Sequence, residues 1–337
     1  MRRSVQARSV NSAPGQTCRF PLGSALSRLL AALRRRLRGG GANDDAVSSS
    51  GCPSPPGVEA KARERKPEIG ADYSPPFSAA QRARSARKVS SSGTSFLQAD
   101  VPVVVPCFNN PTYTARMVSQ LCRLGFRLIV LMDGGSTYPP MRDLLNAPGE
   151  AVSVVLLSEN PGPRHVFLDP VTFATLPRHF CVTDPDLAFN PAMPVDFLDD
   201  LSALSARERV GKAGLALDLS DREAMRDEPI HIGERTWRIW EWEEQFWRDE
   251  LPPLRPGGDP VYRAPVDTTF ALYDKTFFDP DHFLEAVRVA GRFTCRHLPW
   301  YRARELSEEE ERFYRSTQSG SYYLGGENPS PPGRPSR

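Results

Sequence analysis

Short apolar runs alternate with stretches of helical spacing from Val101 onward, and this alternation constrains the fold more than any other feature of the chain. The runs are rich in β-branched and large apolar residues, as is typical of strands that are buried on both faces of a sheet. Strands that alternate with helices predict an α/β fold with a mainly parallel sheet flanked by helices. The expected strands are residues 101–105, 128–132, 152–157, 180–183, 213–217 and 268–273.

Helical spacing fills the gaps between the first strands. Met117, Leu121 and Leu124 recur at steps of three and four residues, Thr112 is the expected N-cap, and Gly125 is the expected end of this helix. A second helix is expected over residues 140–145. This order of elements predicts right-handed crossovers in a doubly wound sheet, whose ligands bind beyond the carboxyl ends of the strands.

Composition divides the chain into a tail and a body. Residues 1–98 are rich in Ser, Pro, Gly, Ala and Arg and carry 17 Lys and Arg against 6 Asp and Glu, whereas the remaining residues carry 26 against 35. A segment so poor in large apolar residues cannot offset the entropy of folding. We therefore predict a disordered basic extension (1–98), one catalytic domain (99–326) and a disordered tail (327–337).

The basic extension suggests a weak contact with an anionic membrane surface, because residues 24–38 combine a leucine stripe with several arginines. A solvated tail fits the same pattern equally well. The acidic body argues against nucleic-acid binding as the main task. The sequence has no apolar run of roughly 18 residues, no secretory signal pattern and no short cysteine spacing typical of zinc sites. These features favour a cytoplasmic protein, and the basic extension allows a peripheral contact with the membrane surface.

Polar or turn-forming residues follow each of the first four expected strands. Asp133-Gly134-Gly135 follows the second, although this tripeptide also suits an ordinary tight turn. Asp184-Pro185-Asp186 follows the fourth, and the first and third strands lead into residues 106–111 and 159–165. Because the carboxyl ends of parallel strands share one edge of the sheet, we expect these segments to converge on one crevice.

The Asp184-Pro185-Asp186 segment is the strongest candidate for a metal site. Two carboxylates where a strand breaks at a proline suit Mn²⁺ or Mg²⁺, which prefer oxygen ligands and commonly bridge carboxylates to a diphosphate. The chain contains a second copy, Asp279-Pro280-Asp281, followed by Phe283, Val287 and Ala290 at helical spacing. For that copy the pattern predicts an N-cap, a proline at the first helical position and a helix.

Taken together, the strand endings resemble the bacterial family 2-like glycosyltransferases of GT-A fold over roughly residues 101–190. The resemblance implies a nucleotide-sugar donor of UDP or GDP type cradled by the first two endings, a basic residue near the diphosphate, and a metal on the Asp-x-Asp element, with a late histidine as a third ligand. The residues that carry it are Val103-Val104-Val105-Pro106-Cys107-Phe108-Asn109, Asp133-Gly134-Gly135-Ser136-Thr137, Asn160-Pro161-Gly162-Pro163-Arg164-His165 and Asp184-Pro185-Asp186. The implied roles fall on Pro106, Phe108, Asn109, Asp133 and Arg164 for the nucleotide, and on Asp184, Asp186 and His297 for the metal.

The sequence departs from the family pattern at two places. The usual Asp-Asn after the second strand is Asp133-Gly134, and the Glu-Asp pair that often supplies the catalytic base is not found at its expected place. A Gln-x-x-Arg-Trp segment is also missing from the sequence, so a processive polysaccharide synthase is not expected.

The second half of the chain is expected to bind the acceptor, a carbohydrate or a lipid-linked molecule. Aromatic residues between Trp237 and Trp247 alternate with glutamates and suit a carbohydrate platform, although a helix that buries one aromatic face gives the same pattern. Asp267, at the start of an expected strand, is the candidate general base, with Glu243 as the next candidate. A structural strand cap is the alternative for Asp267, and a structural histidine is the alternative for His297.

The sequence thus predicts a metal-assisted transferase that moves a hexose or a similar sugar to an acceptor hydroxyl. A nucleotidyltransferase of similar fold is one alternative, but residues 108–111 lack the Gly-rich basic loop expected after its first strand. A catalytically silent nucleotide- or sugar-binding module is the other alternative.

Overall fold

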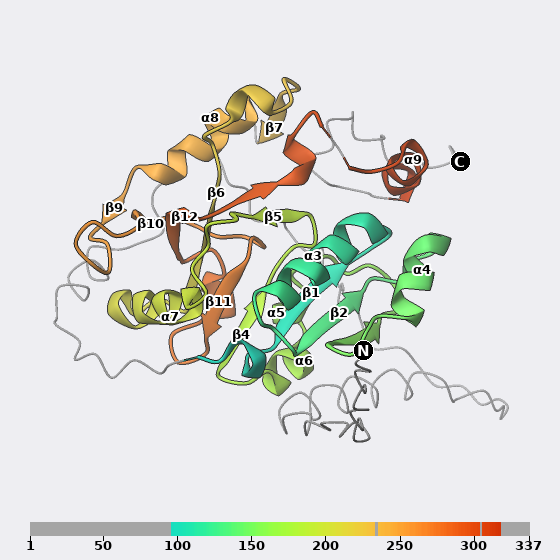
Figure 1. Cartoon of the computed structure of the whole chain (residues 1–337), viewed down its shortest axis with the longest axis horizontal. Coiled ribbons are helices and arrows are strands. Elements are labelled where there is room, and N and C mark those ends of the chain that lie inside the picture. The colour runs from blue at the N-terminus through green and yellow to red at the C-terminus, as the bar shows by residue number, and fades with distance from the viewer. Residues whose placement is uncertain (1–95, 233–234, 304, 318–337) are drawn as a thin grey trace, which may run out of the picture.

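Four parallel strands form the core of the sheet in the computed structural model, which describes residues 96–232, 235–303 and 305–317 (Figure 1). Their order is β3-β2-β1-β4, and β1 and β2 are in register from Val103 opposite Ile129 to Cys107 opposite Asp133. The expected α/β sheet with a parallel core is therefore confirmed. The strands are β1 (Val103–Cys107), β2 (Ile129–Asp133), β3 (Val152–Leu156) and β4 (His179–Val182). The predicted disordered extension and tail lie almost wholly outside the described residues.

The rest of the sheet is mixed, which the sequence did not predict. β11 is antiparallel to both β4 and β6, whereas β12 is parallel to β6 and antiparallel to β5 and β10. A separate hairpin joins β7 to β8. These strands are β5 (Leu187–Phe189), β6 (Lys212–Leu217), β7 (Ile230–Ile232), β8 (Arg235–Trp237), β9 (Glu250–Leu251), β10 (Val261–Arg263), β11 (Ala271–Asp274) and β12 (Val287–His297).

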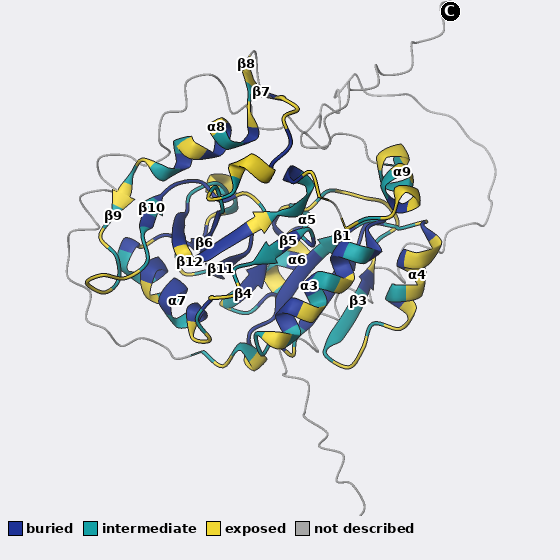
Figure 2. Cartoon of the chain, turned by 45° about the horizontal axis from the view of Figure 1, so that its top comes forward, coloured by how far each residue is buried: buried dark blue, intermediate teal, exposed yellow. Residues whose placement is uncertain are grey.

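Alternate residues of the core strands face two layers of helices. Val103 and Val105 of β1 belong to the apolar cluster that includes Met117 and Phe197, whereas Val104 belongs to a second cluster with Phe167. This is the two-residue period of a strand with both faces covered. Figure 2 shows the buried strands enclosed by helices with exposed outer faces. The first layer contains α3 (Pro111–Arg123), α4 (Pro139–Asn146) and α7 (Phe197–Glu208), and the second contains α5 (His165–Leu168) and α6 (Pro170–Thr175).

The first helix starts earlier than expected. Asn110 is the N-cap of α3 and Pro111 takes its first position, so Thr112 lies inside the helix and is not its cap. Proline suits this position because its missing N–H would have no partner in the first turn. The chain leaves the helix at Gly125, whose φ of 95° favours glycine, as the sequence predicted. The second predicted helix corresponds to α4.

The helix predicted after Asp279 is wrong beyond its first turn. Asp279 does cap a turn at Pro280, accepting a hydrogen bond from the backbone N–H of Asp281, but this turn is the short 3₁₀ helix η4 (Pro280–His282). Val287 and Ala290 belong to the long strand β12. Pairing with β6 and β10 supplies partners for its backbone, and these long-range contacts override the helical spacing.

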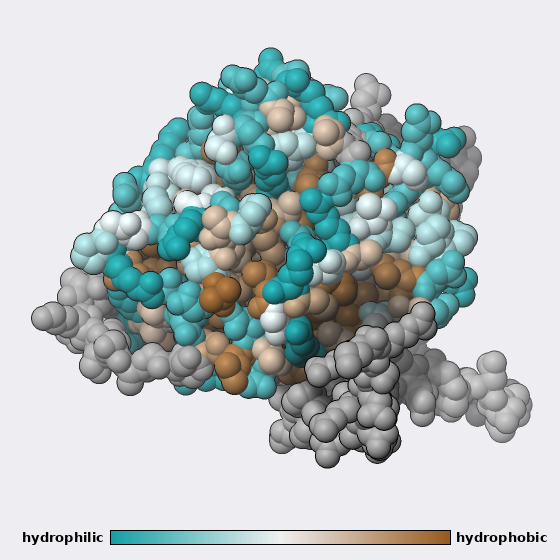
Figure 3. Space-filling view, viewed as in Figure 1, coloured by the Kyte–Doolittle hydropathy of each residue, from teal (hydrophilic) through white to brown (hydrophobic). Residues whose placement is uncertain are grey.

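The remaining elements lie around the ends of the sheet. The C-terminal helix α9 lies beside the starts of α3 and α4 (Figure 1), where Phe313 stacks on Tyr138. On this face of the molecule hydrophilic side chains surround an apolar area near the lower centre (Figure 3). None of the described helices has both the length and the apolar character that crossing a membrane requires. The remaining described helices are η1 (Gln98–Asp100), η2 (Arg222–Ala224), α8 (Ile239–Glu244), η3 (Gln245–Trp247), η5 (Leu298–Trp300) and α9 (Glu308–Thr317).

Candidate active site

Asn109 ties the end of β1 to the loop after β2. Its backbone has a φ of 50°, in the left-handed region that asparagine tolerates better than most residues. Its side-chain Oδ1 accepts hydrogen bonds from the backbone N–H groups of Thr137 (2.8 Å) and Tyr138 (2.9 Å). Its own N–H donates to the hydroxyl of Ser136 at 2.8 Å. Asn109 is fully buried, so it holds the two strand endings together, while its predicted contact with a nucleotide stays a prediction.

Asp133 forms the tight turn that was the alternative to a nucleotide role. Its Oδ2 accepts hydrogen bonds from the N–H groups of Gly135 (3.1 Å) and Ser136 (2.8 Å), and its Oδ1 accepts one from the Ser136 hydroxyl. A Cβ added to Gly134 would lie 2.9 Å from the side-chain oxygen of Asn160, so glycine allows the loop after β3 to approach. The turn thus brings two strand endings together, and the carboxylate is 2% exposed. Pro106 lies in β1 and Phe108 directly follows it, both partly buried.

Asp184 is held by Thr268 from the loop before β11. The backbone N–H of Asp184 donates to the Thr268 carbonyl at 2.9 Å, and the Thr268 hydroxyl donates to Asp184 Oδ2 at 2.6 Å. Burial, followed by the negative charge of Asp186, raises the pKa of the Asp184 carboxyl well above its usual value. Thr268 was not predicted as a site residue, because its contact with Asp184 spans 84 positions of the chain.

Asp186 and His297 lie together, as the metal-site prediction requires. The Nε2 atom of His297 lies 3.4 Å from Asp186 Oδ2, and the backbone carbonyl of Asp186 accepts a hydrogen bond from the N–H of Leu298. Antiparallel pairing of β12 with β5, with His297 opposite Leu187, brings the two residues together. The other carboxylate oxygen, Asp186 Oδ1, is buried and has no hydrogen-bond partner within the described part of the chain.

The donor atoms here fit a divalent cation that is only partly enclosed by protein. Within residues 96–317, apart from the gaps in the description, no group of three or more His, Cys, Asp and Glu side chains is arranged as a complete metal site. Mg²⁺ and Mn²⁺ do not need one, because they commonly take one or two carboxylates and fill the other positions with water and substrate phosphates. Such an ion would satisfy the buried oxygen of Asp186 that has no partner in the described ranges.

Arg164 and Asp267, which were predicted for separate tasks, bind each other. Arg164 Nε and Nη2 donate to the two carboxylate oxygens of Asp267 at 2.9 and 2.8 Å. The guanidinium also lies 4.8 Å from the ring centre of Phe283. Asp267 lies in the loop before β11, which begins at Ala271 and not at residue 268 as predicted. The alternative interpretation of Asp267 as a strand cap is therefore wrong. Its side chain is 53% exposed and can therefore meet a bound molecule.

Glu243, the second candidate base, lies in the interior. It is 2% exposed and forms an ion pair with Arg288, which is itself 5% exposed. Burial raises the pKa of the Glu243 carboxyl, against the opposing effect of Arg288. A carboxylate enclosed in this way favours a structural role, which leaves Asp267 as the better candidate.

The aromatic stretch between Trp237 and Trp247 packs largely inward. Trp242 and Phe246 are buried, and their rings meet edge to face at 5.4 Å. Trp237 meets Trp242 in the same manner at 5.7 Å. The interpretation as core packing is therefore confirmed for Trp242 and Phe246.

Lys212 supports the loop that carries Asp267, a role that no sequence pattern predicts. The side chain is fully buried, and its amine donates to the carbonyl oxygens of Val266 (2.7 Å) and Phe283 (2.5 Å). It also lies 3.5 Å from the centre of the Phe283 ring. Burial holds the pKa of the Lys212 amine well below its usual value. The amine thus fixes the backbone next to Asp267.

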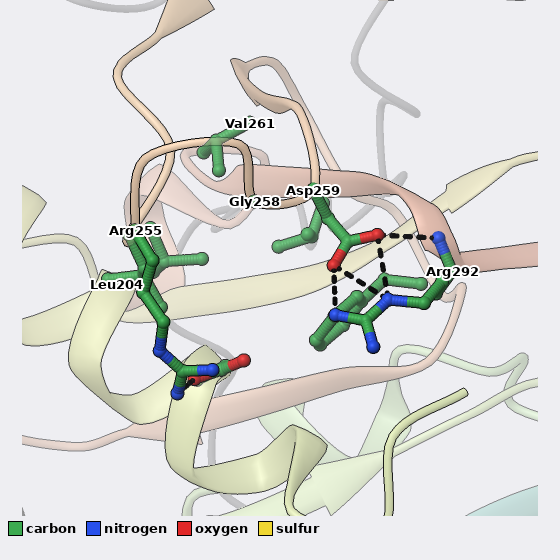
Figure 4. Close-up of a pocket in the computed structure, with 10 residues that line it drawn as sticks. Leu204, Arg255, Gly258, Asp259, Val261 and Arg292 are labelled. Atoms are coloured by element: carbon green, nitrogen blue, oxygen red, sulfur yellow. Dashed lines mark hydrogen bonds and ion pairs between the residues drawn. The ribbon is translucent and has the colours of Figure 1, made fainter. Parts of the chain in front are cut away.

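Two pockets lie in different parts of the molecule. The pocket in Figure 4 lies away from Asp184, and its charges form pairs with one another: Arg255 with Asp200 at 2.6 Å and Arg292 with Asp259 at 2.8 Å. The second pocket adjoins the candidate metal site. It is lined by Asn110, Tyr113, Asp186, Pro299, Leu306, Glu310, Glu311 and Tyr314.

Comparisons with known proteins give low similarity to solved glycosyltransferases. No family model matches the chain, and no curated protein matches its sequence. The mannosyltransferase PcManGT of Pyrobaculum calidifontis, solved with GDP-Man and Mn²⁺, is similar at 14% identity and a TM-score of 0.35 over 63% of this chain. GalNAc-T7, solved with UDP, GalNAc and Mn²⁺, is similar at 14% and 0.38 over 64%. TarS residues 1–349 of S. aureus are similar at 11% and 0.35 over 64%.

The overlap with these structures is partial. This chain covers 62%, 47% and 62% of the three solved chains, less than two thirds of each. The likeness concerns the arrangement of the α/β domain, and the functional argument therefore depends on the residues at the strand ends.

Proposed function

We propose that the protein is a metal-assisted glycosyltransferase that uses a nucleotide-sugar donor of UDP or GDP type. The observation that carries this proposal is the group at the carboxyl end of β4, where Asp186 follows Asp184 by two residues and lies beside His297. Its second oxygen, Oδ1, is buried and has no hydrogen-bond partner among the residues that the structure describes. Buried carboxylate oxygens are stable when a cation or hydrogen-bond donors satisfy them. A divalent cation that also binds a diphosphate meets that need.

The roles of the residues follow from their surroundings. Asp186, with His297 beside it, would hold Mn²⁺ or Mg²⁺ directly, and Asp184 would reach the ion through water. The bound ion would neutralise the charge on the departing nucleoside diphosphate. Thr268 keeps Asp184 in place through its hydroxyl and its carbonyl. Pro106, Phe108, Asn109 and Asp133 would lie beside the bound nucleotide.

Asp267 is the proposed base. Its exposed carboxylate would accept the proton of the attacking acceptor hydroxyl, on a lone pair not used by Arg164. Arg164 holds the carboxylate in one orientation through two hydrogen bonds, and it stays close enough to the diphosphate side to attract negative charge. The acceptor would be a carbohydrate or a lipid-linked molecule.

Donor hydrolysis tests the proposal directly. Nucleoside diphosphate release would be measured over a series of nucleotide sugars, with and without Mn²⁺, for the native protein and for Asp186→Asn. We expect metal-dependent release that falls on the order of 100-fold in the variant, the size typical of losing a key electrostatic group. Asp281→Asn, in the exposed second Asp-Pro-Asp copy, is the matched control and keeps native activity. Release that does not respond to Mn²⁺ or to Asp186→Asn would overturn the proposal.

A binding module without turnover is the second candidate. It is favoured by the hydrogen bonds within the turn, which engage both oxygens of Asp133 and leave less capacity for a ribose or base. Calorimetry with UDP or GDP and Mn²⁺ distinguishes the two functions: binding that depends on Asp186, without hydrolysis of any donor, would support the binding module.

A further inference from the structure

The loop before β11 is held at four successive residues, each by a different part of the chain. The contacts join Pro265 to Arg288 of β12, Val266 to Lys212 of β6, Asp267 to Arg164, and Thr268 to Asp184. From residue 263 to residue 274 the side chains are buried or partly buried, except that of Asp267, which is exposed. The loop therefore presents one carboxylate to solvent while its backbone is fixed from below.

The face of the sheet under residues 265–268 carries two buried cations. Arg288 lies opposite Gly214 of β6 in the register of the sheet, and Lys212 is two residues from Gly214 on the same face of the strand. A Cβ added to Gly214 would lie 2.9 Å from the carbonyl oxygen of Phe270 and 3.2 Å from the side chain of Val266. Glycine at this position therefore lets the loop approach the cations.

Glu243 of α8 sets the orientation of the Arg288 guanidinium. Nη1 of Arg288 forms an ion pair with Glu243, while Nε donates to the Pro265 carbonyl at 2.5 Å. The guanidinium also lies 4.8 Å from the centre of the Phe246 ring. Because a guanidinium is planar and donates in fixed directions, these two contacts aim Nε at Pro265.

A buried ion pair of this kind is a weak source of stability. Glu243 and Arg288 are 2% and 5% exposed, and their removal from water costs free energy that their attraction barely returns. Replacing such a pair by apolar side chains of similar volume is often neutral or stabilising. The hydrogen bond to Pro265, two residues before the exposed Asp267, gives the pair a different role, which concerns position.

We propose that Glu243 and Arg288 are positioning residues, which hold residues 265–268 so that the Asp267 carboxylate stands beside the carboxyl end of β4. The inference rests on the proposed function, in which Asp267 is the base, and adds two residues that act on it without touching the substrate. Thr268 completes the link, because it follows Asp267 directly and binds Asp184 through its carbonyl and its hydroxyl. A displacement of about 1 Å can cost on the order of 100-fold in rate, so a small shift of this loop lowers turnover.

Replacing both members of the pair separates position from stability. The double variant Glu243→Leu with Arg288→Met leaves neither charge unpaired, so its melting temperature should stay close to the native value. The kcat of donor hydrolysis should fall about 10- to 100-fold, because the Pro265 carbonyl is no longer held. The KM for the nucleotide sugar and the affinity for Mn²⁺ should stay within about twofold, as expected when only the transition state is affected.

A second buried pair supplies the matched control. Arg263 of β10 and Glu208 of α7 lie 2.7 Å apart, and their side chains are 3% and 4% exposed. The double variant Glu208→Leu with Arg263→Met should change the melting temperature by a similar amount and keep native kcat. Equal losses of kcat in the two double variants would overturn the inference, because loosening of the fold in general would then explain them.

Arg288→Lys keeps the inference testable if the first double variant does not fold. Lysine retains the positive charge next to Glu243, but a single ammonium replaces the planar fork that reaches both Glu243 and Pro265. We expect a folded protein with lower kcat and native KM. Native kcat in Arg288→Lys would contradict the assignment.

Hydrogen exchange at one amide separates this inference from the proposed function. The N–H of Asp184 donates to the Thr268 carbonyl at 2.9 Å, so its exchange rate reports whether the loop is in place. Without donor or metal, this amide should exchange faster in the Glu243 and Arg288 double variant than in the Glu208 and Arg263 double variant.

The outcomes of the two measurements differ. Faster exchange at Asp184, in a protein whose native form hydrolyses no donor, would mean that the pair holds the loop and that the enzymatic proposal fails. Hydrolysis that depends on Asp186, with native kcat and native exchange in the Glu243 and Arg288 double variant, would leave the enzymatic proposal standing and overturn the positioning role. Faster exchange with native kcat would also overturn it, because the pair would then serve the fold alone.

Discussion

Carboxylates at the two ends of β4 are stabilised in opposite ways. At its amino end, Asp274 of the neighbouring strand β11 accepts two hydrogen bonds from Arg178, both at 3.0 Å, and lies 3.3 Å from His179. The N–H of Thr276 adds a further hydrogen bond at 2.8 Å. Burial by itself raises the pKa of Asp274, but the hydrogen bonds from Arg178 and Thr276 outweigh it and lower the pKa to about 2.

At the carboxyl end, Asp184 and Asp186 have no comparable compensation. In the described part of the chain, Asp184 receives a hydrogen bond from a hydroxyl and Asp186 contacts His297, but neither forms an ion pair with a lysine or an arginine. Pairing with cationic side chains therefore distinguishes the two acidic sites of the sheet. A carboxylate whose charge is balanced by the protein serves the fold, whereas a pair whose charge is not balanced is suited to bind a cation.

The largest expected effect is the separation of metal binding from stability at Asp186. Asp186→Asn should weaken Mn²⁺ binding on the order of 100-fold, because a ligand and its charge are lost. The melting temperature without metal should not fall, because the substitution also removes repulsion between neighbouring carboxylates. Calorimetric titration and thermal unfolding measure the two quantities. A clear loss of stability without a loss of Mn²⁺ affinity would show that Asp186 belongs to the structural class.

The opposite result is expected at Asp274. Asp274→Asn should lower the free energy of unfolding at neutral pH by about 2 kcal/mol, since it removes the interactions that hold the carboxylate ionised. Mn²⁺ affinity should stay native, because Asp274 lies at the other end of β4. Chemical unfolding and Mn²⁺ titration of the same preparation check both parts, and weakened Mn²⁺ binding would contradict the comparison.

The pH dependence of stability provides a third test. The pKa of Asp274 is lower in the folded protein, about 2, than its usual value of 3.8, so protons bind the unfolded chain more readily. Its contribution is complete above pH ~4 and is lost as the pH falls toward ~2, amounting to about 2 kcal/mol. Unfolding curves of the native protein and Asp274→Asn should therefore converge over this interval. Curves that remain parallel would refute the assignment.

The smallest expected effects come from two lysines that hold backbone carbonyls. Lys212 holds the segment before Asp267, whereas Lys275 binds the carbonyls of Phe173 and Leu176 at 2.6 and 2.7 Å and lies 4.5 Å from the Phe173 ring. Each change to methionine should destabilise the fold on the order of 1 kcal/mol, because the carbonyls lose a partner while a partly or fully buried charge is also removed. Only Lys212→Met should also lower kcat. Equal activity of the two variants would show that the Lys212 contact does not reach the site.

The sequence predicted the part of the fold in which local pattern and final structure agree. The apolar runs that became β1, β2 and β4 are buried on both faces, whereas β3 at the edge of the sheet is only partly buried. The endings of these strands meet at one end of the sheet because parallel strands leave it on the same side. The prediction that His297 lies near Asp186 rested on the family resemblance alone. Sequence spacing itself gave no indication that β12 would pair with β5 there.

The wrong or missing predictions have a common physical cause: contacts between residues far apart in the sequence determine the structure at these positions. Val287 and Ala290 recur at spacing compatible with a helix, yet hydrogen bonds to β6 and β10 make the segment a strand. Lysine is usually a surface residue, and only the folded protein supplies the two carbonyls to which the buried Lys212 amine donates. Asp133 was ambiguous from the start, because a turn and a ribose both use a carboxylate that accepts hydrogen bonds.

The contact between Glu310 and Thr112 also has a consequence for how the molecule is made. The two residues are 198 positions apart, so a growing polypeptide can assemble most of its sheet while the start of α3 still lacks this carboxylate. Until α9 has been synthesised and has packed against α3, the pocket next to Asp186 lacks one of its walls. A nascent chain, or one that ends before Glu308, would therefore contain Asp184, Asp186 and His297 while the first turn of α3 still lacks the carboxylate that binds its N–H.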